Sequence, residues 1–202
     1  MSENISKSSI QSGMESLNQL YRIGCGPSSS HTMGPEKACV IFKEKNSAAD
    51  EFKVVLYGSL AKTGKGHCTD SVIENTLAPT PTMVEFDFDK TDIGHPNTME
   101  MFAYKNGEQI DFARVFSVGG GRIEFEGSSS AKEPIVYELS TFSDIKAYCK
   151  EKKYRLWQYV DEVEGEYIWD YLAKVWQTMK DAIERGIEDE GVLPGGLKVK
   201  KK

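Results

Sequence analysis

Ten residues between two Gly/Pro corners constrain the fold of this chain most: Gly26-Pro27-Ser28-Ser29-Ser30-His31-Thr32-Met33-Gly34-Pro35. Pro27 fixes φ and keeps Gly26 away from helical geometry, whereas Pro35 suits the first turn of a helix. The stretch therefore predicts a loop that leads into a helix beginning near Gly34. Backbone amides at a helix start are unpaired and favour a carboxylate or a phosphate, so the loop is a candidate anion site.

The loop also carries side chains that can bind a ligand or move a proton. Its hydroxyls add hydrogen-bond donors, and the imidazole of His31 can give or take a proton near neutral pH. The alternative is an N-cap loop that is simply rich in small polar residues. An imidazole held between two proline corners favours a functional site as much as it favours this structural interpretation.

A second polar stretch, Gly58–Asp70, follows the clearest predicted strand, 52–57, and opens a helix that runs to about Leu77. Its spacing does not match the phosphate-binding pattern G-x-x-x-x-G-K-[ST], so we reject that interpretation. The glycines hold His67 close to the backbone, and Asp70 lies three residues on, where it could fix the tautomer of an imidazole. Alternatively, Thr69 or Asp70 caps the helix and His67 is merely nearby.

The remaining pattern alternates short strands and turns and then becomes helical. Asn106-Gly107 is a strong hairpin signal between two predicted strands. Gly119-Gly120-Gly121 interrupts the sheet pattern and predicts a bulge or a close approach of the backbone to a ligand. His95, before Pro96, is a weaker site candidate and is better explained as part of a turn. The predicted helices are 13–23, 35–45, 143–151 and one that starts at 156 or 161 and ends at 188; the predicted strands are 52–57, 83–88, 98–104, 109–117, 122–126 and 135–139.

The last predicted helix has a broad apolar stripe and contains all three tryptophans, Trp157, Trp169 and Trp176. A helix this aromatic needs a surface to pack on, which indicates another domain or subunit. Residues 191–197 then read as a linker. At the other end, residues 1–13 are polar, lack the apolar core of a secretory signal and read as a flexible arm.

Composition excludes several classes of function. The net charge is -6 and no basic patch lies within the chain, which argues against nucleic acid as a partner. No apolar run is long enough to span a membrane. None of the four cysteines lies in a C-x-x-C pair, so spacing indicates no zinc or redox site, and free thiols in the cytoplasm are expected.

Four motifs, GPSSSHTMGP, GSLAKTGKGHCTD, GHPNTM and SVGGG, occur here in an order that resembles the β domain of iron–sulfur-dependent bacterial L-serine dehydratases (L-serine ammonia-lyases). The resemblance covers roughly residues 15–140. It implies an α+β fold: an α/β sandwich with a mixed, mostly antiparallel sheet packed against helices, similar to the allosteric substrate-binding domain of some phosphoglycerate dehydrogenases. It also implies a β domain over 14–140 and a helical connector over 141–202.

The resemblance further implies a lyase that converts L-serine to pyruvate and ammonia without pyridoxal phosphate, in amino-acid catabolism and gluconeogenesis. A [4Fe–4S] cluster would act as Lewis acid, but its cysteine ligands belong to a separate α domain, and no metal ligand is expected in this chain. We therefore expect a fragment that is inactive alone, partnered by an α domain, with L-serine as substrate and a homo-oligomeric state.

The resemblance implies roles for individual residues. His31 and His67 project into the active site, and one of them takes the Cα proton. The expected substrate contacts are Ser28, Ser29, Ser30, Thr32, Asp70, Gly119 and Gly120. Two other hypotheses stay open: a stand-alone regulatory module that binds L-serine or another small carboxylate or phosphate, and a structural dimerisation domain whose loops are only turns.

Overall fold

A computed structural model of the chain describes residues 13–128, 134–192 and 197–201. The predicted arm, 1–13, lies outside the described residues except for Gly13, and so do 193–196 of the predicted linker. The chain forms two compact units. One comprises Ile23–Ala131 with Arg185–Lys202, and the other comprises Met1–Arg22 with Lys132–Glu184. These two units have other bounds than the predicted β domain, 14–140, so that domain stays a prediction.

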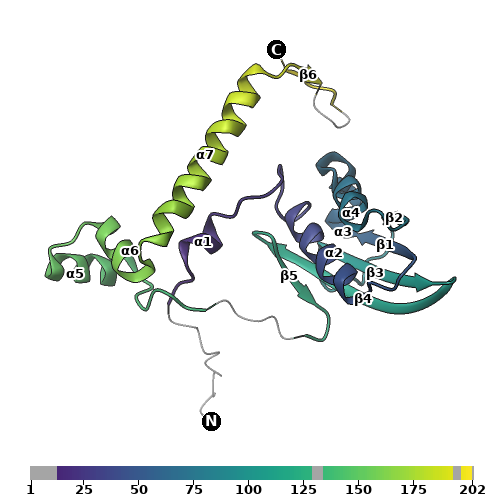
Figure 1. The fold of residues 1–202 in the computed structure, drawn as a ribbon, viewed down its shortest axis with the longest axis horizontal. Coiled ribbons are helices and arrows are strands. Elements are labelled where there is room, and N and C mark those ends of the chain that lie inside the picture. The colour runs from purple at the N-terminus through teal and green to yellow at the C-terminus, as the bar shows by residue number, and fades with distance from the viewer. Residues whose placement is uncertain (1–12, 129–133, 193–196, 202) are drawn as a thin grey trace, which may run out of the picture. The chain divides into compact units, whose positions relative to one another are not determined.

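The first unit, Ile23–Ala131 with Arg185–Lys202, is built on a five-stranded sheet in the order β2-β1-β3-β4-β5 (Figure 1). Only β1 and β2 pair in parallel, and the other neighbours are antiparallel. The predicted mixed, mostly antiparallel sheet is therefore confirmed. The strands are β1 (Glu51–Tyr57), β2 (Thr82–Asp87), β3 (Thr98–Lys105), β4 (Glu108–Gly119) and β5 (Arg122–Phe125).

Helices cover one face of this sheet: α2 (Met33–Lys45), α3 (Gly58–Thr63) and α4 (Thr69–Leu77). Alternate residues of each strand point toward them, as the period of two in a strand requires. The core between helices and sheet consists of fully or almost fully buried side chains: Ala38, Cys39, Phe42, Phe52, Val54, Leu56, Leu60, Ile73, Leu77, Met99, Met101, Ala103 and Val115. The fold class, an α+β sandwich, is confirmed.

Two local predictions in this unit hold in detail. The helix after the loop Gly26–Pro35, called the serine loop from here on, begins at Met33, next to the start predicted near Gly34. The hairpin between β3 and β4 has positive φ at both central residues, 51° at Asn106 and 80° at Gly107. This is the conformation that Asn-Gly favours in a two-residue turn, because Gly lacks a Cβ and Asn tolerates the left-handed region.

The polar stretch Gly58–Asp70, which the sequence predicts as a loop that opens a helix, is helical over most of its length. The segment forms α3 and then a 3-10 turn, η1 (Gly64–His67), and Cys68 ends it in the left-handed conformation with φ 58°. Leu60 and Ala61 are buried against the core and stabilise these turns despite the high glycine content. Tertiary burial therefore outweighs the poor helix propensity of glycine here.

The second unit is helical. It contains α1 (Leu17–Leu20), α5 (Phe142–Lys152), α6 (Leu156–Glu164) and most of α7 (Tyr167–Glu188). Its small core is rich in tyrosine: Tyr137, Cys149 and Tyr159 are buried, with Leu17, Val136, Leu139, Ile145, Tyr148, Tyr154 and Val163 packed against them. A short pairing of β6 (Gly191–Val192) with β7 (Lys200–Lys201) follows α7.

Three sequence predictions are corrected by this part of the structure. The helix predicted over 13–23 has only four residues, Leu17–Leu20. The strand predicted over 135–139 is a single bridge between Met14 and Tyr137. The long helix predicted from 156 or 161 to 188 is broken into α6 and α7 at Gly165, whose φ of 77° and ψ of -177° are open almost only to glycine.

Among the described residues, no helix is long and apolar enough to cross a membrane.

Candidate active site

The four motifs come together at one edge of the sheet. Because β3 is antiparallel to both β1 and β4, the end of β1, the start of β3 and the end of β4 lie at the same edge: Leu56 pairs with Met99, and Thr98 pairs with Phe116. The backbone joins them directly, since Ser59 N–H donates to the carbonyl of Pro96 at 2.7 Å.

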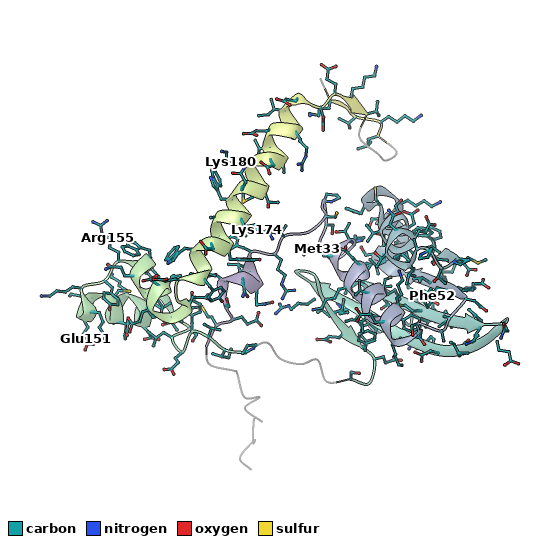
Figure 2. The ribbon with its side chains drawn as sticks, viewed as in Figure 1. Met33, Phe52, Glu151, Arg155, Lys174 and Lys180 are labelled. Atoms are coloured by element: carbon teal, nitrogen blue, oxygen red, sulfur yellow. The ribbon has the colours of Figure 1, made fainter. Side chains whose placement is uncertain are left out.

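The serine loop reaches this edge because α2 begins there. A Cβ on Gly34 would lie 2.2 Å from the buried Ser117 hydroxyl, so only glycine fits between α2 and β4. A Cβ on Gly121 would lie 3.2 Å from Met33, which occupies the N-terminal end of α2 in Figure 2. The backbone of α2 at Gly34 therefore packs against a side chain of β4, and the backbone at Gly121 packs against a side chain of α2.

Two imidazoles form the centre of the site. The ring centroids of His31 and His67 are 4.5 Å apart, with the ring planes tilted by 36°. His31 is 6% exposed, whereas His67 is half-buried. Burial lowers the pKa of His31 and outweighs the opposing hydrogen bond to the Ser59 backbone, and the neighbouring imidazole acts in the same direction as burial. At neutral pH the His31 ring is therefore uncharged, and its burial disfavours protonation.

Hydrogen bonds occupy both nitrogens of His31. The hydroxyls of Ser28 and Ser30 each lie 3.1 Å from Nδ1. On the other side of the ring, the Thr63 hydroxyl lies 2.9 Å from Nε2 and the Ser59 carbonyl lies 3.3 Å from it. Ser28, Ser30 and His31 thus form one network, as expected for a common site.

His67 is held by only one nitrogen. Its Nδ1 lies 2.9 Å from the carbonyl oxygen of Thr63, and within the described chain its Nε2 has no partner. The predicted partner, Asp70, accepts instead from the amide of Ser71 at 3.0 Å and makes no hydrogen bond to His67 among the described residues. The expectation that Asp70 orients His67 is therefore corrected: the backbone of Thr63 does so.

Thr32 also differs from its expected role. It is 1% exposed, and its hydroxyl lies 2.5 Å from the Cys25 carbonyl and 2.9 Å from the Ser28 carbonyl. Both groups are acceptors, so the single proton of the hydroxyl is used in holding the loop closed. Thr32 is thus a buried residue that shapes the serine loop.

Of the three consecutive serines, Ser28 to Ser30, only Ser29 has a hydroxyl that remains available to a ligand within the described chain. Within the described chain, neither its hydroxyl nor its amide has a hydrogen-bond partner, and the amide of Ser30 is free as well. Three other loop amides are used internally: those of His31 and Thr32 donate to the Ser28 carbonyl, and that of Gly34 donates to the Ser29 carbonyl. The unpaired Ser29 and Ser30 amides therefore keep the anion-binding potential inferred from the sequence.

The glycine run marks a bulge in the sheet. Gly119, Gly120 and Gly121 have φ values of 100°, 59° and 71°, and the pairing register of β4 and β5 shifts between Ser117 and Gly119. A Cβ on Gly119 or Gly120 would meet nothing within 4 Å. These two glycines are therefore required by backbone conformation and leave open space at the edge of the sheet.

His95 lies at the same edge and holds the turn before β3. Its Nδ1 accepts from the amide of Asn97 at 3.0 Å, and its carbonyl accepts from the Thr98 hydroxyl at 2.5 Å. The structural interpretation of this histidine as a turn residue fits these contacts. Ser59 and Thr63, in contrast, were missed as site residues, although the i, i+4 spacing of two hydroxyls beside His67 was visible in the sequence.

The cysteines do not form a metal site. Cys25 and Cys68 are exposed, Cys39 and Cys149 are buried singly, and burial raises the pKa of Cys39 to about 12. Over the described part of the chain, no three His, Cys, Asp or Glu side chains are grouped so that they could hold a metal ion. An iron–sulfur cluster therefore does not fit the described residues, and no chemical step is derived through one.

The pattern of the family described as serine dehydratase beta chain matches residues 16–80, which include the serine loop, both histidines of the pair and Thr63. Residues 16–80 therefore match a serine dehydratase beta-chain domain. It is similar to L-serine dehydratase 1 of Escherichia coli, with 35% identity over 92% of this chain and 52% of that protein. It is also similar to the L-serine dehydratase of Streptomyces coelicolor, with 28% identity over 93% of this chain and 53% of that protein.

A third relative, the L-serine dehydratase of Mycobacterium bovis, is 31% identical over 93% of this chain and 51% of its own length. The chain thus spans about half the length of the curated relatives it matches.

Proposed function

We propose that this chain is the beta-chain half of an L-serine dehydratase and supplies substrate-contacting serine and histidine side chains to an active site shared with a second half. The observation that carries the proposal is the His31–His67 pair, whose ring centroids are 4.5 Å apart and whose His31 ring contacts Ser28 and Ser30. The names of the relatives support L-serine as substrate, and the enzyme would release pyruvate and ammonia. The alternative, a stand-alone sensor, is not favoured because the relatives are named as enzymes.

Within this proposal the two histidines have different tasks. His67 is the more exposed ring and its Nε2 is free within the described chain, so it takes the Cα proton of the substrate. His31 is buried with both nitrogens in hydrogen bonds, so it orients Ser28 and Ser30. The free amides of Ser29 and Ser30 and the Ser29 hydroxyl bind the substrate carboxylate.

The proposed partner is the α domain, which would correspond to the half of the relatives that this chain does not span, and it would hold the [4Fe–4S] cluster. The long helix α7, on which Lys174 and Lys180 are labelled in Figure 2, supports a partner surface. Its apolar stripe starts at the buried Ile168, yet Trp176, Met179 and Ile183 are 59%, 50% and 53% exposed. Large apolar side chains repeated along one helix face are typical of a protein interface.

The test is reconstitution. The chain alone is expected to be free of iron and inactive, and its mixture with the separately produced second half of an L-serine dehydratase is expected to release pyruvate from L-serine. His67→Ala should abolish that activity and His31→Ala should reduce it at least about a hundredfold, as for loss of a general base or its support. Ser71→Ala, in the neighbouring α4, serves as the control and should retain full activity.

Pyruvate formation by the chain alone would contradict the shared site. Sub-millimolar binding of L-serine to the chain alone, measured by calorimetry and abolished by His67→Ala, would instead favour a sensor.

A further inference from the structure

Thr63 contacts both imidazoles of the site, each through a different chemical group. Its side-chain hydroxyl lies 2.9 Å from Nε2 of His31, and its backbone carbonyl lies 2.9 Å from Nδ1 of His67. We propose that Thr63 is a positioning residue that fixes opposite tautomers in the two rings, Nε2–H in His31 and Nδ1–H in His67. The inference deepens the proposed function and rests on it only where activity is concerned.

The tautomer of His67 follows from the nature of a carbonyl. A carbonyl oxygen can only accept a hydrogen bond, so the nitrogen beside it must carry the hydrogen. His67 is therefore protonated on Nδ1, and its lone pair is on Nε2. This is the less common tautomer of a free neutral histidine, which makes the assignment specific to this site.

The tautomer of His31 follows from the single proton of the Thr63 hydroxyl. That hydroxyl donates to the Ser59 carbonyl, four residues earlier, at 2.9 Å, as threonines within helices commonly do. It then faces His31 with a lone pair, and the Ser59 carbonyl, 3.3 Å from the same Nε2, is an acceptor as well. The Ser59 hydroxyl, 3.4 Å away, can also accept. The Ser59 carbonyl and the Thr63 hydroxyl favour a hydrogen on Nε2, and the Ser59 hydroxyl is compatible with it.

The two assignments place the lone pairs of the rings in different surroundings. On His31 the lone pair is on Nδ1, where it accepts from the hydroxyl of Ser28 or Ser30. On His67 the lone pair is on Nε2, which no group of the described chain occupies. One residue between the two rings thus directs one lone pair into the serine network and leaves the other open.

The first experiment measures the tautomers directly in the whole chain. The chain contains three histidines, so a two-bond ¹H–¹⁵N correlation spectrum at neutral pH resolves three ring systems, assigned with His67→Gln and His95→Gln. We expect Nε2–H for His31 and Nδ1–H for His67. Nε2–H in His67, or Nδ1–H in His31, would overturn the inference.

The second experiment removes the hydroxyl alone. Thr63→Val keeps the backbone carbonyl and the shape of the side chain, so His67 should be unchanged. The minor tautomer of His31 should rise about fivefold, the value of one hydrogen bond of about 1 kcal/mol. Thr63→Ser should restore the original ratio. The matched control is Thr76→Val, since Thr76 also donates to the carbonyl four residues earlier, at 2.7 Å, without touching an imidazole.

An unchanged His31 in Thr63→Val, or the same change in Thr76→Val, would overturn the role of the hydroxyl. In the reconstituted enzyme, Thr63→Val should lower kcat more than it changes KM, and Thr63→Ser should recover it. If the tautomers are as expected but no pyruvate forms in any mixture, the proposed function fails while the tautomer assignment stands.

Discussion

At the scale of single residues, the site depends on two close approaches that glycine and burial make possible. Gly34 brings the first turn of α2 against β4, where Ser117 is 1% exposed and its hydroxyl has no partner within the described chain. His31 is fixed on the loop that precedes this turn. Packing at Gly34 and burial at His31 therefore both affect the stability of the site.

Replacing Gly34 with alanine should destabilise the unit that contains the five-stranded sheet, called the sheet unit below, by about 1–3 kcal/mol, because overpacking a tight contact has this cost. The new Cβ would lie 2.2 Å from Ser117 Oγ and 3.0 Å from Ser117 Cβ. Urea unfolding followed by far-ultraviolet circular dichroism measures the loss. Adding Ser117→Gly should recover most of it, and Gly66→Ala, where a Cβ meets nothing within 4 Å, should be nearly neutral. A neutral Gly34→Ala would contradict the packing described here.

His31 should make the stability of the folded chain depend on pH below about 6.5. Its pKa is lowered in the folded state, chiefly by burial, from the ordinary value of 6.5. As the pH falls through that value, the unfolded chain binds a proton that the folded chain does not, and stability is lost. His31→Gln should flatten the fall in unfolding free energy between pH 7.5 and 5.5, whereas Thr76→Val should not. An equally steep fall in His31→Gln would assign it to other groups.

At the scale of elements, a buried carboxylate at the end of α6 links three other segments of the helical unit through hydrogen bonds. Glu164, at the end of α6, is 7% exposed and accepts four hydrogen bonds. They come from Ser16 Oγ and Leu17 N–H at 2.7 Å, Tyr137 OH at 2.9 Å and Tyr167 OH at 3.0 Å. These donors lower the pKa of Glu164 although burial, the largest single influence, acts to raise it. A buried charge is stable here because every partner is a donor.

Glu164→Gln should therefore destabilise the helical unit by about 2–4 kcal/mol, because the amide NH₂ would face hydroxyl and amide donors that then lack an acceptor. All three tryptophans lie in this unit, so fluorescence during urea unfolding reports on it. Glu162→Gln is the matched control: Glu162 accepts one exposed hydrogen bond from Tyr148 at 2.9 Å, and its loss should cost less than about 1 kcal/mol. Equal losses of unfolding free energy in the two variants would show that the four donors around Glu164 add no stability.

At the scale of the whole molecule, the described chain has two cores that share no residue. The sheet unit buries aliphatic and phenylalanine side chains between α2–α4 and the strands, whereas the helical unit buries mainly tyrosines. Separate cores are expected to unfold as separate cooperative units.

Leu56→Ala tests this separation. Leu56 is fully buried in the sheet core, and its truncation should cost about 2–5 kcal/mol. The transition seen by circular dichroism should move to lower urea, while the tryptophan transition should keep its midpoint. A joint shift of both transitions would mean that the units unfold together.

Local chemistry was sufficient for much of the fold and for part of the site. Asn-Gly determined the hairpin, Pro35 and the apolar spacing determined α2, and the four motifs in order identified the family. The sandwich could be predicted because strand and helix patterns are properties of neighbouring residues along the chain. The roles of Ser28, Ser30, His31 and His67 remain predictions, although contacts now join these four residues.

Other features were decided only by tertiary structure. The sequence offered Asp70 as the partner of His67 and Thr32 as a substrate contact, but folding gave Thr63 the first role and buried the second residue. Glu164 looked like any surface glutamate, because its four donors come from segments up to 148 residues away. Spacing along the chain predicts which residues share a helix face, but burial and hydrogen-bond partners across the fold determine which side chain reaches which ring.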